Sequence, residues 1–217
     1  MPELHTLFMD AVQEEHRRLS SRRGMLAGGA KIAAGGAIAA GLAGSPALAR
    51  MVAAAQAFTD DIDILNYALT LEHLEYAFYR DGLALFTPDN FEAGVFDNLI
   101  LARDHELIHR DTLSATITSL GGTPVTEATY DFGYSNAAGF VAVAAALENT
   151  GVSAYTGAAA SIQNVDLLNA AGSIVPIEAR HASYLNLVNG MDPFPDAFET
   201  PLTRDEVLAI AGPFIVG

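Results

Sequence analysis

Helical spacing of apolar residues runs through nearly the whole chain from residue 59 to residue 190, and this pattern constrains the fold more than any other feature. No stretch shows the strict alternation of apolar and polar residues that is typical of a strand. Turn-forming residues interrupt the pattern at three places, which are 87–90, 121–122 and 163–164. The sequence therefore predicts four long helices, over about 59–86, 91–120, 136–162 and 165–190.

The connections between these helices predict how they are joined. The first and third connections are short, whereas the second, residues 123–135, is longer and rich in Pro, Thr, Asp and Gly. Two helix hairpins joined by a longer crossover are typical of an all-α, ferritin-like four-helix bundle. The tail, residues 191–217, is turn-rich and adds one short helix over about 203–211, where Thr203 and Glu206 form a capping box.

The first 49 residues resemble a twin-arginine export signal. They contain Ser21-Arg22-Arg23-Gly24-Met25-Leu26, a Gly/Ala-rich stretch over 27–44 and Ala47-Leu48-Ala49 before an expected cleavage site. We expect residues 1–49 to be the signal, 50–58 a linker and 59–190 the bundle, with export to the periplasm or the cell exterior. A retained membrane anchor and an ordinary N-terminal helix are the alternatives, although Lys31 and the many glycines disfavour a stable span.

Charge and composition limit the molecules and ions that the chain is expected to bind. Residues 50–217 carry 6 arginines, no lysine and 22 acidic residues, so their formal net charge is −16. Such a surface repels nucleic acid and anionic lipid, so we expect neither as a partner. The chain has no cysteine, so any metal must be held by oxygen and nitrogen atoms.

Two Glu-x-x-His pairs predict a metal site. Glu106 and His109 fall in the second helix, and Glu178 and His181 in the fourth. Residues three apart project from the same helix face, so each pair can bind one ion together. Pro176, just before the second pair, removes a backbone donor from the fourth helix.

The first and third helices repeat a second pattern. Glu72 precedes Tyr79 by seven residues, and Glu148 precedes Tyr155 by seven, which is two turns along one face. This repeat favours Glu72 over Glu75 as a ligand. At about 1.5 Å per residue, Glu72 and Glu106 lie about equally far from the first turn, and the other two carboxylates are nearly level about the second. All six groups can therefore meet in one layer.

Burial supports the same interpretation. Glu148 is the one charged side chain between residues 136 and 164, in a helix that is apolar nearly all round. A lone buried carboxylate is costly unless it is paired or bound to metal. The alternatives are an exposed position or an ion pair, for which the available partners are Arg103, Arg110 and Arg180.

Several neighbouring side chains have two interpretations each. Tyr79 and Tyr155 either hydrogen-bond the ligand carboxylates or relay an electron, or they only pack in the core. Glu75 is either an additional ligand or a partner for Arg80. His73 and His105 adjoin ligands but point about 100° away on the helix, so we predict that they do not share the metal and lie beside the ligands or at the surface.

One Glu from each of two helices and a Glu-x-x-His pair from each of the other two form the ligand set of di-iron and di-manganese bundles. At these residues the chain resembles the ferritin-like superfamily. The segments DIDILNYALTLEHLEYAFYRDGL and PFPDAFETPLTRDEVLAIAGPFI are most similar to exported ferritin-like proteins related to desiccation-associated proteins. The resemblance implies that Glu72 and Glu148 are terminal ligands, that Glu106 and Glu178 bridge the metals, and that His109 and His181 bind one metal each.

The implied function is redox chemistry of a dinuclear Fe or Mn centre with peroxide, dioxygen or ferrous iron, in oxidative or desiccation stress. Two alternatives stay open. One is a metal-poor protein with a structural or protective role, and the other is iron storage in a shell, which needs a closed homo-oligomer.

Overall fold

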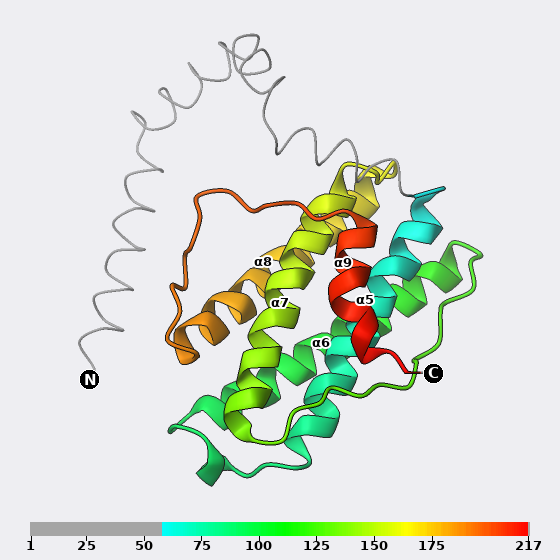
Figure 1. The fold of residues 1–217 in the computed structure, drawn as a ribbon. Helices are drawn as coiled ribbons and strands as arrows, with labels where there is room; N and C mark the ends of the chain where they lie inside the picture. Colours follow the sequence, from blue (N-terminus) through cyan, green and yellow to red (C-terminus); the bar gives the residue numbers. More distant parts are fainter. Residues whose placement is uncertain (1–57, 217) are drawn as a thin grey trace. The chain divides into compact units, whose positions relative to one another are not determined.

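The computed structural model describes residues 58–216, which are all-α apart from one isolated bridge (Figure 1). The four long helices are α5 (Asp61–Leu83), α6 (Val95–Ser119), α7 (Ala137–Ala159) and α8 (Val165–Val188). A short helix α9 (Arg204–Ala211) follows, and 3-10 turns form η1 (Pro88–Asn90) and η2 (Gly212–Phe214). The predicted four-helix bundle with a short C-terminal helix is confirmed. The predicted export signal lies outside the described residues.

Local chemistry sets the helix ends. The side chain of Asp60 caps α5 by accepting a hydrogen bond from the Asp63 backbone N–H. Helix α6 begins at Val95, later than predicted, because residues 88–90 form η1 and Gly94 adopts a φ of 84°. Residues with a side chain rarely adopt that conformation.

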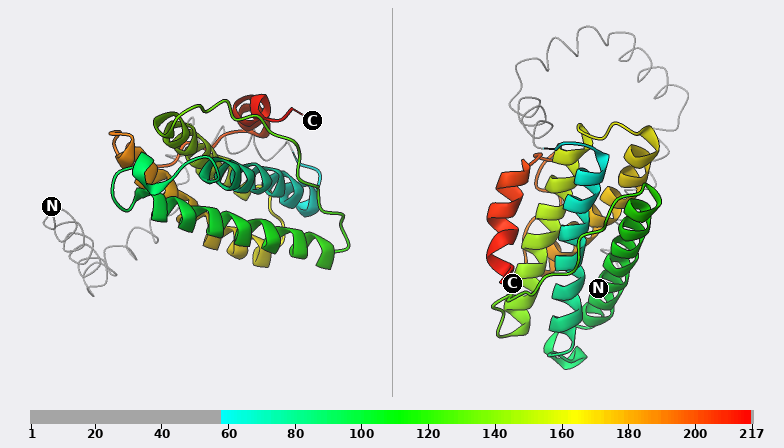
Figure 2. Two further views of the ribbon diagram at one scale, coloured as in Figure 1. Left: turned by 90° about the horizontal axis from the view of Figure 1, so that it is seen from below. Right: turned by 90° about the vertical axis from the view of Figure 1, so that its right-hand side faces the viewer.

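The helices pack as two hairpins, α5 with α6 and α7 with α8, which meet mainly through α5 and α7. Figure 2 shows α5 between α6 and α7, with α9 on the other side of α7. Helices α6 and α8 contact each other much less. The predicted crossover runs along the bundle and bonds to the C-terminal segment, where Asp131 N donates to Phe214 O and Val216 N to Thr129 O.

A glycine allows the C-terminal segment to approach α7 closely. A Cβ atom at Gly157 would clash with the Leu202 carbonyl oxygen, so a side chain there would require the backbone to move. Leu202 N donates to Ser153 O beside it. The predicted capping box of Thr203 and Glu206 then starts α9, whose buried Val207 packs in the core.

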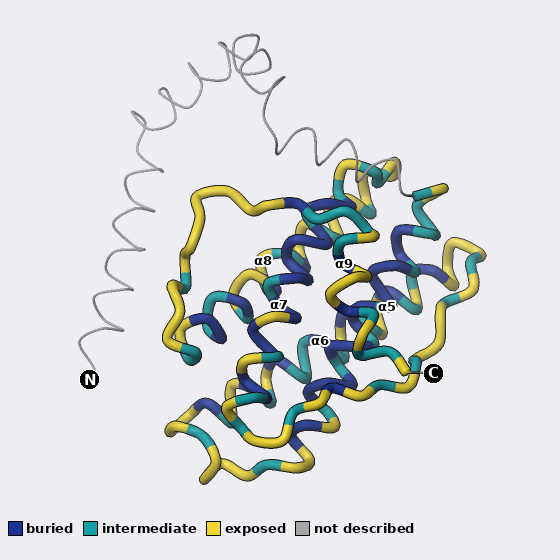
Figure 3. Tube along the Cα trace, viewed as in Figure 1, coloured by how far each residue is buried: buried dark blue, intermediate teal, exposed yellow. Residues whose placement is uncertain are grey.

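Two apolar clusters form the core. The larger one centres on aromatic rings, among which Phe78 and Phe140 stack with centroids 4.6 Å apart. The smaller one contains Leu69, Leu113 and Ile174. Along α6 and α8, a fully buried glutamate separates residues of one cluster from those of the other. Figure 3 shows buried residues along the whole bundle and an exposed segment after α8.

Helix α7 is the one described helix that is long and apolar enough to cross a membrane by length and composition. However, 61% of its most apolar window is buried inside the bundle. A core helix passes the same test.

Candidate metal centre

The structure brings all six predicted ligands together in one layer of the bundle. Each of the four long helices contributes one glutamate that is 0% exposed, and α6 and α8 add a histidine each. The four carboxylates are Glu72, Glu106, Glu148 and Glu178. Such burial is costly for an ionised carboxylate without compensating partners.

The ligand atoms fall into two groups of four, and within each group they lie within 4.8 Å of one another. The first group contains Glu72 and His109, and the second contains Glu148 and His181. Glu106 and Glu178 belong to both groups. The geometry therefore offers two adjacent positions for a cation that share two carboxylates.

The Nδ1 atoms of the two histidines face these carboxylates. His109 Nδ1 lies 2.9 Å from Glu178 Oε1, 3.1 Å from Glu106 Oε2 and 3.5 Å from Glu72 Oε2. His181 Nδ1 lies 2.9 Å from Glu106 Oε1 and 3.3 Å from Glu148 Oε2. Each imidazole thus contacts carboxylates from at least two helices.

Many of these atoms have no hydrogen bond of normal geometry although they lie close together. In the described part of the chain the buried atoms without a hydrogen-bond partner include Glu72 Oε2, Glu106 Oε1, Glu148 Oε2, Glu178 Oε1, Glu178 Oε2 and His181 Nδ1. Buried polar atoms are normally satisfied. Atoms that are close but not aligned with one another are arranged as ligands of a common ion would be, so the residues fit a metal.

One alternative for Glu148 was an ion pair with an arginine, and the described residues show no such pair. Arg103 pairs with Asp104 at 2.7 Å, and Arg110 pairs with Asp111 at 2.6 Å. Glu148 is fully buried and hydrogen-bonds to Tyr79 instead. An exposed position for Glu148 is also contradicted.

The two tyrosines connect α5 and α7 reciprocally. Tyr79 Oη donates to Glu148 Oε1 at 2.5 Å, and Tyr155 Oη donates to Glu72 Oε1. Each tyrosine follows the glutamate of its own helix by two turns and bonds to the glutamate of the other, because α5 and α7 are antiparallel. Burial and the neighbouring carboxylate raise the pKa of both phenols well above its ordinary value, so both stay protonated.

Burial and mutual repulsion hold protons on part of the cluster when no metal is bound. Burial raises the pKa of Glu72 to about 8, and burial with the charge of Glu106 raises that of Glu178 well above its usual range. Glu106 differs because the nearby imidazoles of His109 and His181 outweigh its burial and lower its pKa to about 2.

The same contacts act on the imidazoles in the opposite direction. Burial alone would lower their pKa values, but the close carboxylates of Glu106, Glu178 and Glu72 raise the pKa of His109 to about 12. Glu148 and Glu106 likewise raise the pKa of His181 to about 11. Without a metal, two imidazolium groups therefore supply positive charge to the cluster, and a bound metal must replace their Nδ1 protons.

Glu75 lies beside the cluster rather than with Arg80. It is 3% exposed, whereas Arg80 pairs with Asp81 and Glu127 at the surface. A Cβ atom at Gly151 would lie 3.0 Å from Glu75 Oε1 and 3.8 Å from Glu178 Oε2, so the missing side chain makes room for the fifth carboxylate. Burial and four neighbouring glutamates raise the pKa of Glu75 well above its ordinary value.

The two remaining histidines have different surroundings. His73 Nε2 lies 3.2 Å from the Val125 carbonyl oxygen, in the crossover. His105 Nδ1 lies 2.9 Å from His181 Nε2, and the two rings stack with an angle of 10°. Sequence spacing excluded His105 as a partner of the metal bound by its neighbour Glu106, but it gave no sign of this contact, which depends on how α6 packs against α8.

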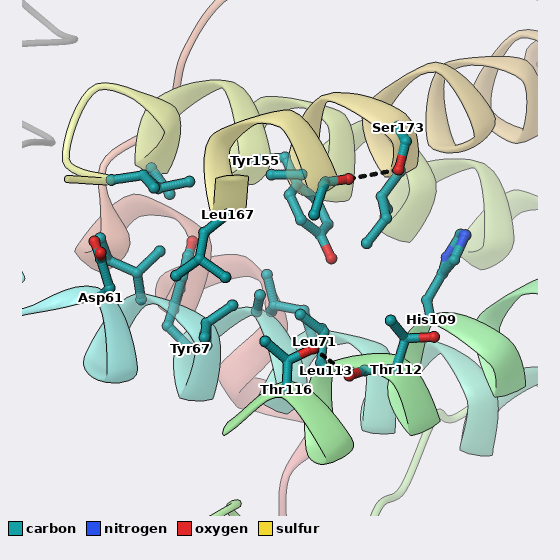
Figure 4. Close-up of a pocket in the computed structure, with 18 of the residues that line it drawn as sticks. Asp61, Tyr67, Leu71, His109, Thr112, Leu113, Thr116, Tyr155, Leu167 and Ser173 are labelled. Atoms are coloured by element: carbon teal, nitrogen blue, oxygen red, sulfur yellow. Dashed lines mark hydrogen bonds between the residues drawn. The ribbon is translucent and has the colours of Figure 1, made fainter. Parts of the chain in front are cut away.

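Among the residues that the structure describes, two openings lie beside the cluster, one next to each histidine. A cavity of about 240 Å³ ends at His109 and is lined by residues of all four helices (Figure 4). A second, more open cleft of about 210 Å³ lies between α6 and α8 beside His181, and His105, Arg180 and Tyr184 line it. Both form where α6 and α8 pack loosely.

The fold and the cluster together define a class of protein, a four-helix bundle with carboxylates and histidines gathered at its centre. The model of the ferritin-like domain family matches residues 60–191. This match covers more than half of the chain, so the chain belongs to the ferritin-like domain family.

Two proteins illustrate how far the similarity extends. Protein rds1 of Schizosaccharomyces pombe is 27% identical over 169 residues, which are 74% of this chain and 40% of that protein. The chain thus spans less than half the length of this relative. The crystal structure of a conserved hypothetical protein, rv2844, from Mycobacterium tuberculosis is similar with a TM-score of 0.52 and 24% identity, over 68% of this chain and 99% of the other. That structure supports the fold alone.

Proposed function

We propose that the protein is an exported dinuclear metal protein that uses two Fe or Mn ions for redox chemistry with peroxide, dioxygen or ferrous iron. One observation carries the proposal, namely that the two groups of ligand atoms share Glu106 and Glu178. Glu72 and His109 would hold one ion, Glu148 and His181 would hold the other, and Glu106 and Glu178 would be available to both.

Charge balance supports two divalent ions. Four ionised glutamates and two neutral imidazoles carry a charge that two divalent cations neutralise in full, and the buried layer contains no arginine or lysine among the described residues. Carboxylate and imidazole ligands without thiolate suit Fe and Mn.

The protein's own groups hold and shield the reacting atoms. The metals supply the electrons for oxidation and reduction. Tyr79 and Tyr155 orient the two terminal carboxylates and are the nearest phenols for relaying an electron. Glu75 supplies a further carboxyl group beside Glu178, either as an extra ligand or as a place to hold a proton.

Export and stress protection are part of the proposal. Their support is the likeness of residues 21–49 to a twin-arginine signal and of residues 61–83 and the tail to exported ferritin-like proteins related to desiccation-associated proteins. A homo-oligomer is compatible with this role.

The test loads the full chain anaerobically with Fe(II) or Mn(II), adds dioxygen or hydrogen peroxide, and measures oxidant consumption. We expect consumption above buffer with at least one metal, and its loss in Glu106→Gln. Glu92→Gln is the matched control, because Glu92 is exposed and lies outside the cluster. Equal rates in Glu106→Gln and the unchanged protein would contradict the proposal.

The contacts of the histidines favour one second candidate, a metal-poor bundle with a structural or protective role. Imidazolium groups at His109 and His181 can pair with the carboxylates at 2.9 Å each and close the cluster without metal. This candidate predicts that added Fe(II) raises neither the oxidation rate nor the melting temperature. A metal-dependent rise in either quantity would contradict it.

A further inference from the structure

The cavity beside His109 has walls that are mostly aliphatic. Its lining includes Ile64, Leu65, Leu71, Leu113, Leu167 and Ile174, which come from three helices. In Figure 4, Asp61 and His109 lie at opposite ends of the cavity, with Leu71 and Tyr155 between them. The inner end thus lies against a predicted metal ligand, and Tyr155 joins the wall to the carboxylate of Glu72.

Most polar side chains in the cavity wall already form hydrogen bonds with backbone groups of the protein. Asp61 accepts hydrogen bonds from the backbone of Gln163 at 2.8 Å and of Asn164 at 2.9 Å. Thr116 Oγ1 donates to Thr112 O, and Ser173 Oγ donates to Ala170 O. These groups are therefore not oriented to recognise a charged ligand.

One buried polar atom at the wall has no partner. Tyr67 lines the cavity, is 4% exposed, and its hydroxyl has no hydrogen-bond partner among the described residues. Burial raises the pKa of this phenol, so it stays protonated and can donate one hydrogen bond. A ligand with a single oxygen would satisfy it.

We propose that this cavity binds a small uncharged organic molecule, apolar over most of its surface, next to the His109 half of the cluster. An apolar cavity of about 150 Å³ in another protein binds benzene. A cavity of about 240 Å³ accordingly has room for a molecule of the size of naphthalene or a hydrocarbon chain of similar volume. Binding depends on the cavity alone, whereas a role of the ligand as substrate rests on the proposed metal function.

The test uses the full chain, naphthalene as the probe and 2-naphthoate as its charged counterpart. We expect naphthalene to raise the melting temperature of the metal-free protein, and 2-naphthoate to bind at least about tenfold more weakly because its charge would be buried. No binding of naphthalene, or tighter binding of 2-naphthoate, would overturn the proposal.

A filling substitution tests the location. Ala171 is partly buried in the cavity wall, so Ala171→Phe should fill the cavity and abolish the naphthalene shift. Ala171→Leu is a milder version if the first variant does not fold. Ala115→Phe is the matched control, because Ala115 is exposed on α6 and does not line the cavity. Naphthalene binding that survives in both Ala171 variants would overturn the assignment.

Proximity to the cluster is tested separately with Mn(II). In protein loaded with Mn(II), the paramagnetic ion should broaden the NMR signals of bound naphthalene, and the metal-free protein should leave them sharp. Binding without broadening in protein that contains Mn(II) would place the ligand elsewhere and overturn the proposal. If naphthalene binds but no Mn(II) loads, the metal function fails and the cavity site stands.

Discussion

The two halves of the ligand cluster are built alike and surrounded differently. In each half, a glutamate held by a tyrosine and a histidine from a Glu-x-x-His pair meet the shared carboxylates. Beyond these ligands the halves diverge. His181 stacks on His105 in a cleft with Arg180, whereas His109 faces a mostly aliphatic cavity.

The difference separates two tasks. The repeated helix hairpin positions the ligand side chains. Residues that differ between the two hairpins line the openings, and they determine which molecules can approach each half. A second ring such as His105 fixes the proton of a ligating imidazole on the nitrogen away from the metal. No described residue does this for His109 Nε2, so we expect the two metal positions to differ in affinity and in the molecules that approach them.

The largest expected effect comes from a shared carboxylate. Glu106→Gln should weaken both metal positions by more than about 100-fold, whereas Glu72→Gln should weaken only the position of His109. Metal titration followed by calorimetry separates the two steps. If Glu106→Gln weakened only one metal position, as Glu72→Gln is expected to do, the two halves would not share Glu106.

The pH dependence of the metal-free protein tests the electrostatic balance. The pKa values of His109 and His181 rise from 6.5 to about 12 and 11, so their contribution to stability is complete below pH 6.5 and is lost as pH rises through those values. Glu72, raised from 4.5 to about 8, loses its contribution between these values. Metal-free protein should therefore be less stable at pH 8 than at pH 6, by about 2 kcal/mol or more.

Urea unfolding at the two pH values measures this change. The metal-loaded protein should not lose stability in the same way, because the metal replaces the imidazole protons and binds more tightly as pH rises. A metal-free protein that becomes more stable between pH 6 and pH 8 would contradict the assigned protonation states.

A smaller effect distinguishes the halves. His105→Ala should weaken the metal position of His181 by about 10–100-fold and leave that of His109 unchanged. His73→Ala is the matched control, since His73 contacts the crossover carbonyl of Val125 instead of a ligand. If His105→Ala weakened both metal positions equally, His105 would not act on the His181 position alone.

Effects of similar size are expected from the tyrosines. Tyr79→Phe and Tyr155→Phe each remove one hydrogen bond to a terminal carboxylate. A hydrogen bond to a charged partner contributes about 1–3 kcal/mol of free energy, so we expect each variant to weaken metal binding by up to this amount. The first should act on the Glu148 half and the second on the Glu72 half, and metal titration can compare them. If both variants weakened the same half, or if each weakened both halves equally, the reciprocal arrangement would be contradicted.

Sequence spacing could predict the fold and the meeting of the six ligands because both depend on helical periodicity. Equal depth along each hairpin brings Glu72 level with Glu106, and no long-range information is needed for it. The His105–His181 contact and the cavity could not be predicted, since both arise from the loose packing between α6 and α8. The start of α6 at Val95 was also not predicted, because Gly94 ends a local turn and the spacing of apolar residues gives no information about its geometry.

The metal content of the protein isolated from its native host tests the central claim most directly. Elemental analysis of the intact chain should give close to two Fe or Mn ions per chain, and anomalous diffraction should place them between the Glu72–His109 and Glu148–His181 pairs. One ion per chain, or a cluster that stays free of metal in protein from that source, would contradict the account.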